Sequence, residues 1–217
     1  YILVGELDKN HKNGLDHNKL SPIYHPYDGA PIKIMSHSLH PVGVSDMLTR
    51  DTINILTYNF FLRPPGIQDN DHDDYKNERV KEFLKVLPDY DIICLQEVFG
   101  LMNDRKINLI NYGKEFGFLY HAETPAPSKD FLIEGGLLIL SRFPILATDF
   151  QAFQKGYHTD QVVEKGVLYT KILVKNAILH LFHSHMPAYG GRNEAFKSWR
   201  PFMTRVFDAH GYKKGDL

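Results

Sequence analysis

The strongest constraint on the fold of this chain is a carboxylate that ends an apolar run. Residues 91–98 read Asp-Ile-Ile-Cys-Leu-Gln-Glu-Val, a segment of strand length with Glu97 next to its last position. A carboxylate at the end of a buried strand is costly unless it is hydrogen-bonded, paired or bound to a metal ion. The segment therefore predicts a buried strand with a polar site at its carboxyl end.

A second segment, residues 52–59, also has strand character and ends in the amide Asn59. One Asn oxygen and one Glu carboxylate, converging from adjacent strands, suit a hard cation such as Mg²⁺, which takes few protein oxygens and several waters. We therefore expect Asn59 and Glu97 to be metal ligands. Two alternatives stay open: Glu97 as a buried, hydrogen-bonded structural acid, and Asn59 as an amide that satisfies turn backbone groups.

Composition narrows the class of protein. The 217 residues are 43% hydrophobic and carry a net charge of −1, so we expect a globular chain that does not bind nucleic acid through its overall charge. No run approaches the roughly 18 apolar residues of a membrane span, so any membrane contact is expected to be peripheral. The single cysteine, Cys94, favours a reducing, intracellular compartment. The chain starts with Tyr1 rather than Met, which indicates a processed chain or a fragment.

Residues 1–50, rich in Pro, Gly, His and Asn, are predicted to form an extended N-terminal arm with one short strand near 32–35. Residues 51–217 are predicted to form the domain. Apolar spacing predicts helices over 75–87, ended by Pro88, over 104–116 and over 193–209. Further strands are predicted over 118–121, 136–141, 145–149, 162–174 and 177–186.

Four motifs together resemble the endonuclease/exonuclease/phosphatase superfamily. They are residues 56–59 (Leu-Thr-Tyr-Asn), 95–98 (Leu-Gln-Glu-Val), 135–145 (beginning Gly-Gly) and 183–185 (His-Ser-His). Asp160, five residues before Lys165-Gly166, is similar to the neutral sphingomyelinase branch. The resemblance implies an α+β fold: a four-layer α/β/β/α sandwich of two mixed sheets flanked by helices, as in DNase I.

The resemblance also implies residue roles. Asn59 and Glu97 would hold Mg²⁺, and His185 would donate a hydrogen bond to a phosphate oxygen. Lys165 would meet the substrate phosphate when Asp160 releases it. The substrate would be a phospholipid or sphingolipid at a membrane surface. The alternatives are a core histidine at position 185 and a weak surface pair of Asp160 with Lys165; His183 is expected to lie deeper.

The chain departs from the superfamily after the histidine strand. Beyond residue 189 there is no Asp-x-Asn, and the only later Asp–His pairing is Asp208-Ala209-His210. The sandwich is thus expected to be incomplete at the C-terminus. Three interpretations stay open: a Mg²⁺-dependent phosphodiesterase of the neutral sphingomyelinase type, another phosphoesterase such as a nuclease or phosphoinositide phosphatase, or a catalytically dead relative that serves as a structural subunit of a larger assembly.

Overall fold

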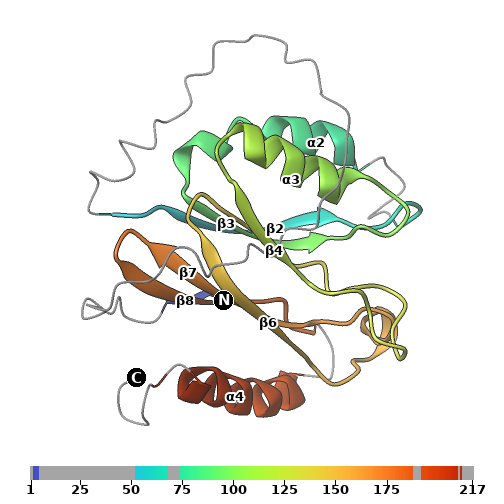
Figure 1. Ribbon diagram of the computed structural model, residues 1–217. Coiled ribbons are helices and arrows are strands. Elements are labelled where there is room, and N and C mark those ends of the chain that lie inside the picture. The colour runs from blue at the N-terminus through green and yellow to red at the C-terminus, as the bar shows by residue number, and fades with distance from the viewer. Residues whose placement is uncertain (1, 5–51, 68–73, 188–191, 210, 212–217) are drawn as a thin grey trace.

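The computed structural model describes residues 2–4, 52–67, 74–187, 192–209 and 211, which form four layers (Figure 1). Helices α2 (Lys76–Phe83) and α3 (Arg105–Glu115) cover the outer face of one sheet. A second sheet lies beneath the first, and helix α4 (Arg192–Ala209) covers its far side. The predicted α/β/β/α sandwich is confirmed.

The sheets differ in strand direction. The first has the order β2-β3-β5-β4 and is mixed, because β2 and β3 run parallel while the other pairs are antiparallel. The second has the order β1-β8-β7-β6 and is antiparallel at each pairing of the described strands, so the prediction of two mixed sheets is right for one of them only. The strand bounds are β1 (Ile2–Val4), β2 (Ile55–Leu62), β3 (Ile92–Val98), β4 (Tyr120–Glu123), β5 (Leu138–Ser141), β6 (Ile145–Ala152), β7 (Gly166–Val174) and β8 (Ala177–Ser184).

The connections explain this difference. Strands β2 and β3 are parallel because α2 crosses between them, as parallel neighbours require. Strands β7 and β8 are joined by a tight turn in which Lys175 has a left-handed φ of 55°, and such a turn makes its two strands antiparallel.

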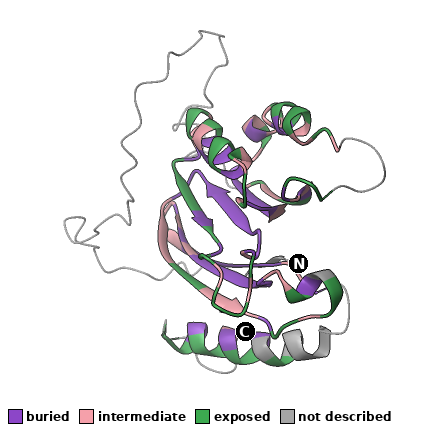
Figure 2. Ribbon diagram, turned by 90° about the vertical axis from the view of Figure 1, so that its right-hand side faces the viewer, coloured by how far each residue is buried: buried purple, intermediate pink, exposed green. Residues whose placement is uncertain are grey.

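Three apolar layers hold the four structural layers together, and the central strands β3, β5, β7 and β8 are mostly buried between them (Figure 2). Along β8 the residues alternate between two layers, as in any strand: Leu179 and Leu181 pack between the sheets, whereas Phe182 packs against α4. The same alternation sends His183 to the space between the sheets, where its ring lies against the backbone of β3.

Some element bounds differ from the prediction. Strand β2 continues past Asn59 to Leu62, with a register break on the way. Helix α2 ends at Phe83, and Pro88 lies inside a short 3-10 helix, η2 (Leu87–Asp89).

Strand β1 pairs with β8, whereas the strand expected near 32–35 lies outside the described residues. The boundary between arm and domain stays a prediction. Among the described helices, none is both long and apolar enough to cross a bilayer.

Candidate active site

The site is built around an unusual backbone conformation at the end of β3. Ile93 and Leu95 face the helices, and Ile92 and Cys94 face the second sheet, so strict alternation would turn Glu97 towards the helices. Glu97 instead has a left-handed φ of 58°. Its carboxylate consequently meets side chains from β2 and from the end of β8.

The first of these is Asn59. Its Nδ2 donates a hydrogen bond to Glu97 Oε1 at 2.8 Å, and its Oδ1 accepts one from the backbone N–H of Phe61 at 3.0 Å. The amide thus satisfies a turn backbone group, as one alternative proposed, and also contacts the carboxylate. The two predicted metal ligands lie side by side on parallel neighbouring strands.

His185 follows the last residue of β8 and faces the same carboxylate. Its Nε2 lies 3.7 Å from Glu97 Oε1, and its buried Nδ1 has no hydrogen-bond partner among the described residues. Burial, and then the positive charge of Lys165, lower the pKa of His185 from 6.5 to about 4. The imidazole is therefore neutral at pH 7, and its contact with Glu97 is not an ion pair there.

His183 lies deeper than His185. Its side chain is fully buried, with Nε2 2.9 Å from the backbone oxygen of Leu95, and the amide of Gln96 is next to its ring. Burial lowers the pKa of His183 to about 4. This neutral ring, which belongs to the second sheet, thus contacts the backbone of β3 two residues before Glu97.

Asp160 and Lys165 form a buried pair rather than a surface pair. Lys165 Nζ lies 2.8 Å from Asp160 Oδ1, and their side chains are only 10% and 8% exposed. Asp160 belongs to the 3-10 helix η3 (His158–Gln161), and Lys165 directly precedes β7. Lys165 Nζ also donates to the backbone oxygen of Met186 at 3.4 Å, one residue from His185.

The structure thus brings all five predicted residues to one end of the sandwich. Asn59, Glu97 and His185 form one group, and Asp160 and Lys165 form a second group that touches the first through residue 186. The arrangement brings two candidate oxygen ligands, a neutral imidazole and a lysine together at one end of the two sheets.

The donor set fits a hard cation bound mainly by water. The described residues contain no group of three His, Cys, Asp or Glu side chains that surrounds an ion. Glu97 Oε2 has no hydrogen bond among those residues, and Asn59 Oδ1 keeps a second lone pair. Mg²⁺ keeps several of its water ligands, so one carboxylate and one amide oxygen are enough protein ligands for it.

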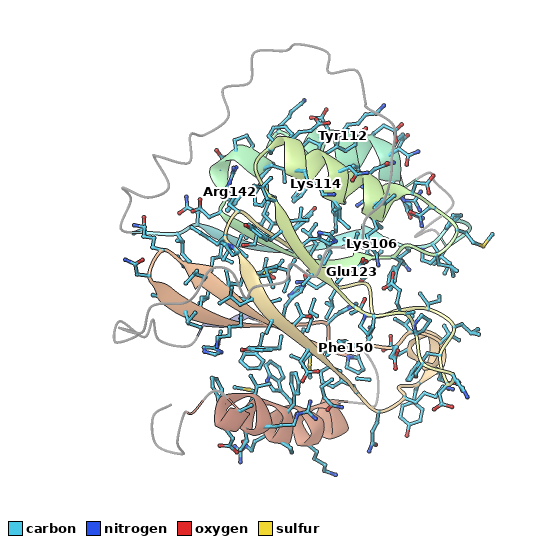
Figure 3. The ribbon with its side chains drawn as sticks, in the orientation of Figure 1. Lys106, Tyr112, Lys114, Glu123, Arg142 and Phe150 are labelled. Atoms are coloured by element: carbon cyan, nitrogen blue, oxygen red, sulfur yellow. The ribbon has the colours of Figure 1, made fainter. Side chains whose placement is uncertain are left out.

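Sequence reasoning missed the residues that support these strand ends. Glu134 accepts hydrogen bonds from the backbone of Gly100 at 2.8 Å and of Gly136 at 2.5 Å. It also pairs with buried Lys106 at 2.7 Å. Lys106 contacts Glu123 as well, at 2.9 Å, and these two residues are labelled in Figure 3. These charged residues come from three separate elements, a loop, α3 and β4, so their association forms no pattern in the sequence. Gly136 has a positive φ of 67°, a conformation that favours glycine, so here the residue type in the sequence does indicate the local backbone.

Comparison with known proteins finds a matching family model and several similar proteins. A family model described as Endonuclease/Exonuclease/phosphatase family matches residues 52–207. A sphingomyelinase of Dictyostelium discoideum is 34% identical over 160 residues, which cover 68% of this chain and 34% of that protein. The chain therefore spans about a third of the length of this curated relative.

Solved structures show the same fold. Sphingomyelinase C from Streptomyces griseocarneus superimposes with a TM-score of 0.57 at 22% identity, over 74% of this chain and 60% of that one. A beta toxin mutant from Staphylococcus aureus, with bound magnesium ions, gives a TM-score of 0.57 at 18% identity, over 71% of this chain and 59% of that one.

Proposed function

Because the chain belongs to the Endonuclease/Exonuclease/phosphatase family, we propose that it forms part of a Mg²⁺-dependent phosphodiesterase of the sphingomyelinase type. The observation that carries the proposal is the contact of Asn59 with Glu97, with His185 3.7 Å from the same carboxylate oxygen. Similarity to the Dictyostelium sphingomyelinase supports the substrate class, a sphingolipid with a phosphocholine-like headgroup.

Each residue has a role that its surroundings support. Glu97 and Asn59 would hold the cation; when bound, Mg²⁺ supplies positive charge that polarises the scissile phosphate. His185 is neutral and largely buried, so it is suited to donate a hydrogen bond to a phosphate oxygen without electrostatic repulsion from Mg²⁺.

Lys165 is the only one of these five residues that brings a positive charge to the site at pH 7. Its flexible stem and compact ammonium suit a contact that changes partner. In the described arrangement the ammonium is paired with Asp160, so Asp160 would have to release it before it meets a phosphate.

Because the proposed substrate lies in a bilayer, we also propose peripheral membrane contact. The intracellular location expected from Cys94 stays a prediction.

The test compares three substrates with the full-length protein and Mg²⁺: sphingomyelin vesicles, abasic DNA and a phosphoinositide. We expect hydrolysis of sphingomyelin. Cleavage of DNA or of the phosphoinositide alone would reassign the substrate, and no cleavage of any of the three would favour a structural subunit.

The matching variant is Glu97→Gln, which removes one charge and keeps the side-chain shape. We expect it to lower Mg²⁺-dependent hydrolysis more than about 100-fold, since changes even outside the ligand shell cost 10–100-fold. Glu82→Gln is the control, because Glu82 is an exposed carboxylate of α2, paired with Lys85. Equal activity and equal Mg²⁺ affinity in Glu97→Gln and the control would refute the ligand assignment.

A further inference from the structure

Two residues after Asn59, strand β2 adopts a conformation that its sequence does not favour. Phe61 has a φ of 56°, in the left-handed region, although it is neither glycine nor asparagine. The pairing with β3 shifts register over the same stretch, between Asn59 and Leu62. A bulky residue keeps such a conformation only when contacts around it impose it.

Arg79 of α2 makes those contacts. Its Nη1 donates to the backbone oxygen of Phe60 at 2.7 Å, and its Nη2 donates to that of Phe61 at 3.0 Å. Successive carbonyl groups of a regular strand point to opposite sides, so one guanidinium could not bind both. The left-handed turn at Phe61 brings the two carbonyls to one side, and the guanidinium stabilises that turn. The Nε of Arg79 is fixed in turn by the backbone oxygen of Asp74 at 2.8 Å.

The same peptide unit reaches the candidate metal site. The carbonyl of Phe60 and the N–H of Phe61 belong to one planar group and point in opposite directions. Arg79 holds the carbonyl end, and the N–H end donates to Asn59 Oδ1 at 3.0 Å. Asn59 then donates through Nδ2 to Glu97. Fixing one end of this peptide therefore fixes the orientation of the Asn59 amide.

We propose that Arg79 is a positioning residue for Asn59, acting through the 60–61 peptide and not by contact with substrate or metal. The inference rests on the proposed function because it assumes a metal at Asn59. The hydrogen bonds from Arg79 to Asn59 through this peptide are present without the metal. Lysine could not replace Arg79, because a single ammonium lacks the planar fork that binds two carbonyls. Arg105 provides a matched comparison: within the described part of the chain its Nη2 donates to the backbone oxygen of Arg63 alone, at 3.3 Å and beyond the turn.

The first measurement is the Mg²⁺ dissociation constant of the full-length protein without substrate, by titration calorimetry. We expect Arg79→Lys to weaken it about tenfold or more, as for other residues that orient ligands. Arg105→Lys should leave it unchanged. Phe61→Gly in the Arg79→Lys background should restore part of the affinity, because glycine adopts the left-handed turn unaided. Loss of affinity in Arg79→Lys without rescue by Phe61→Gly would reduce Arg79 to a general structural role.

The second measurement needs no metal. In protein labelled with ¹⁵N-asparagine, the side-chain amide signals of Asn59 are identified by their absence from Asn59→Asp. We expect Arg79→Lys to move them towards the positions of a free amide, while Arg105→Lys leaves them in place. If the unsubstituted protein binds no Mg²⁺, the metal assignment fails but this signal still decides the role of Arg79. Unmoved Asn59 signals in Arg79→Lys would overturn the inference.

Discussion

Removing one member of the buried Asp160–Lys165 pair should be far more costly than removing both. The ammonium and carboxylate are 2.8 Å apart, and the two residues are 7% and 9% exposed. At an effective dielectric constant near 20 their attraction is about 6 kcal/mol, most of which offsets the desolvation of the two charges. Asp160→Asn leaves Lys165 buried without its counter-charge, and such losses cost about 3–5 kcal/mol. We expect the lower end, about 3 kcal/mol, because Met186 still accepts a hydrogen bond from Nζ.

The assay is urea unfolding followed by circular dichroism for Asp160→Asn, Lys165→Met and the double variant. The double variant removes both charges, so we expect it to recover most of the stability lost in either single variant. The control is Asp149→Asn, because Asp149 pairs with Arg205 at 3.1 Å with side chains 47% and 59% exposed. That substitution should cost less than about 1 kcal/mol. Single-variant losses as small as the control's would refute the reasoning and restore the surface-pair interpretation.

Two further predictions concern buried titratable groups. With folded-state pKa values of about 4 for His183 and His185, the unfolded chain binds more protons between about pH 4 and 6.5, so unfolding free energy should fall on acidification through that window. Each ring contributes up to about 3 kcal/mol to this change in unfolding free energy. In His183→Gln or His185→Gln the urea midpoint should therefore depend less steeply on pH. An unchanged slope would contradict the burial of neutral rings. Burial alone would lower the pKa of Lys106, but Glu134 and Glu123 outweigh it and raise that pKa. Glu134→Gln should therefore cost about 3 kcal/mol by thermal unfolding, and a loss no larger than that of exposed Glu82→Gln would contradict it.

The elements and their buried faces could be predicted from sequence because burial imposes a period on apolar residues. Strand alternation separates Leu181 from Phe182, and the structure places Leu181 in the inter-sheet layer and Phe182 on the α4 side. The apolar spacing that predicts the last helix includes Trp199 and Phe207, and both pack in the layer between α4 and the second sheet. These patterns depend only on whether each face of an element is buried or exposed, and that difference is visible in the order of apolar and polar residues in a single sequence.

The details of the site could not be predicted in this way. Alternation would have placed Glu97 with Leu95 on the helix side, and nothing in the sequence signals a left-handed glutamate. The burial of Lys165 against Asp160 depends on how η3 packs against the residue that precedes β7, a contact between residues with no periodic pattern. The motif resemblance, and not residue patterning, brought Asp160 and Lys165 into the predicted set.

Left-handed backbone conformations occur at or near both candidate ligands. Asn59 and Glu97 lie on parallel neighbouring strands, and each strand has a left-handed, non-glycine residue there: Phe61 in β2 and Glu97 itself in β3. Each such residue is unfavourable by about 1–2 kcal/mol, and strain of this kind persists where surrounding contacts impose it. In β2 that support is Arg79, and in β3 it is the hydrogen bond from the N–H of Val98 to Gly136. A substitution of Arg79 or of Gly136 should therefore disturb the ligand geometry before it unfolds the sandwich, because neither residue belongs to the apolar layers that hold the sheets together.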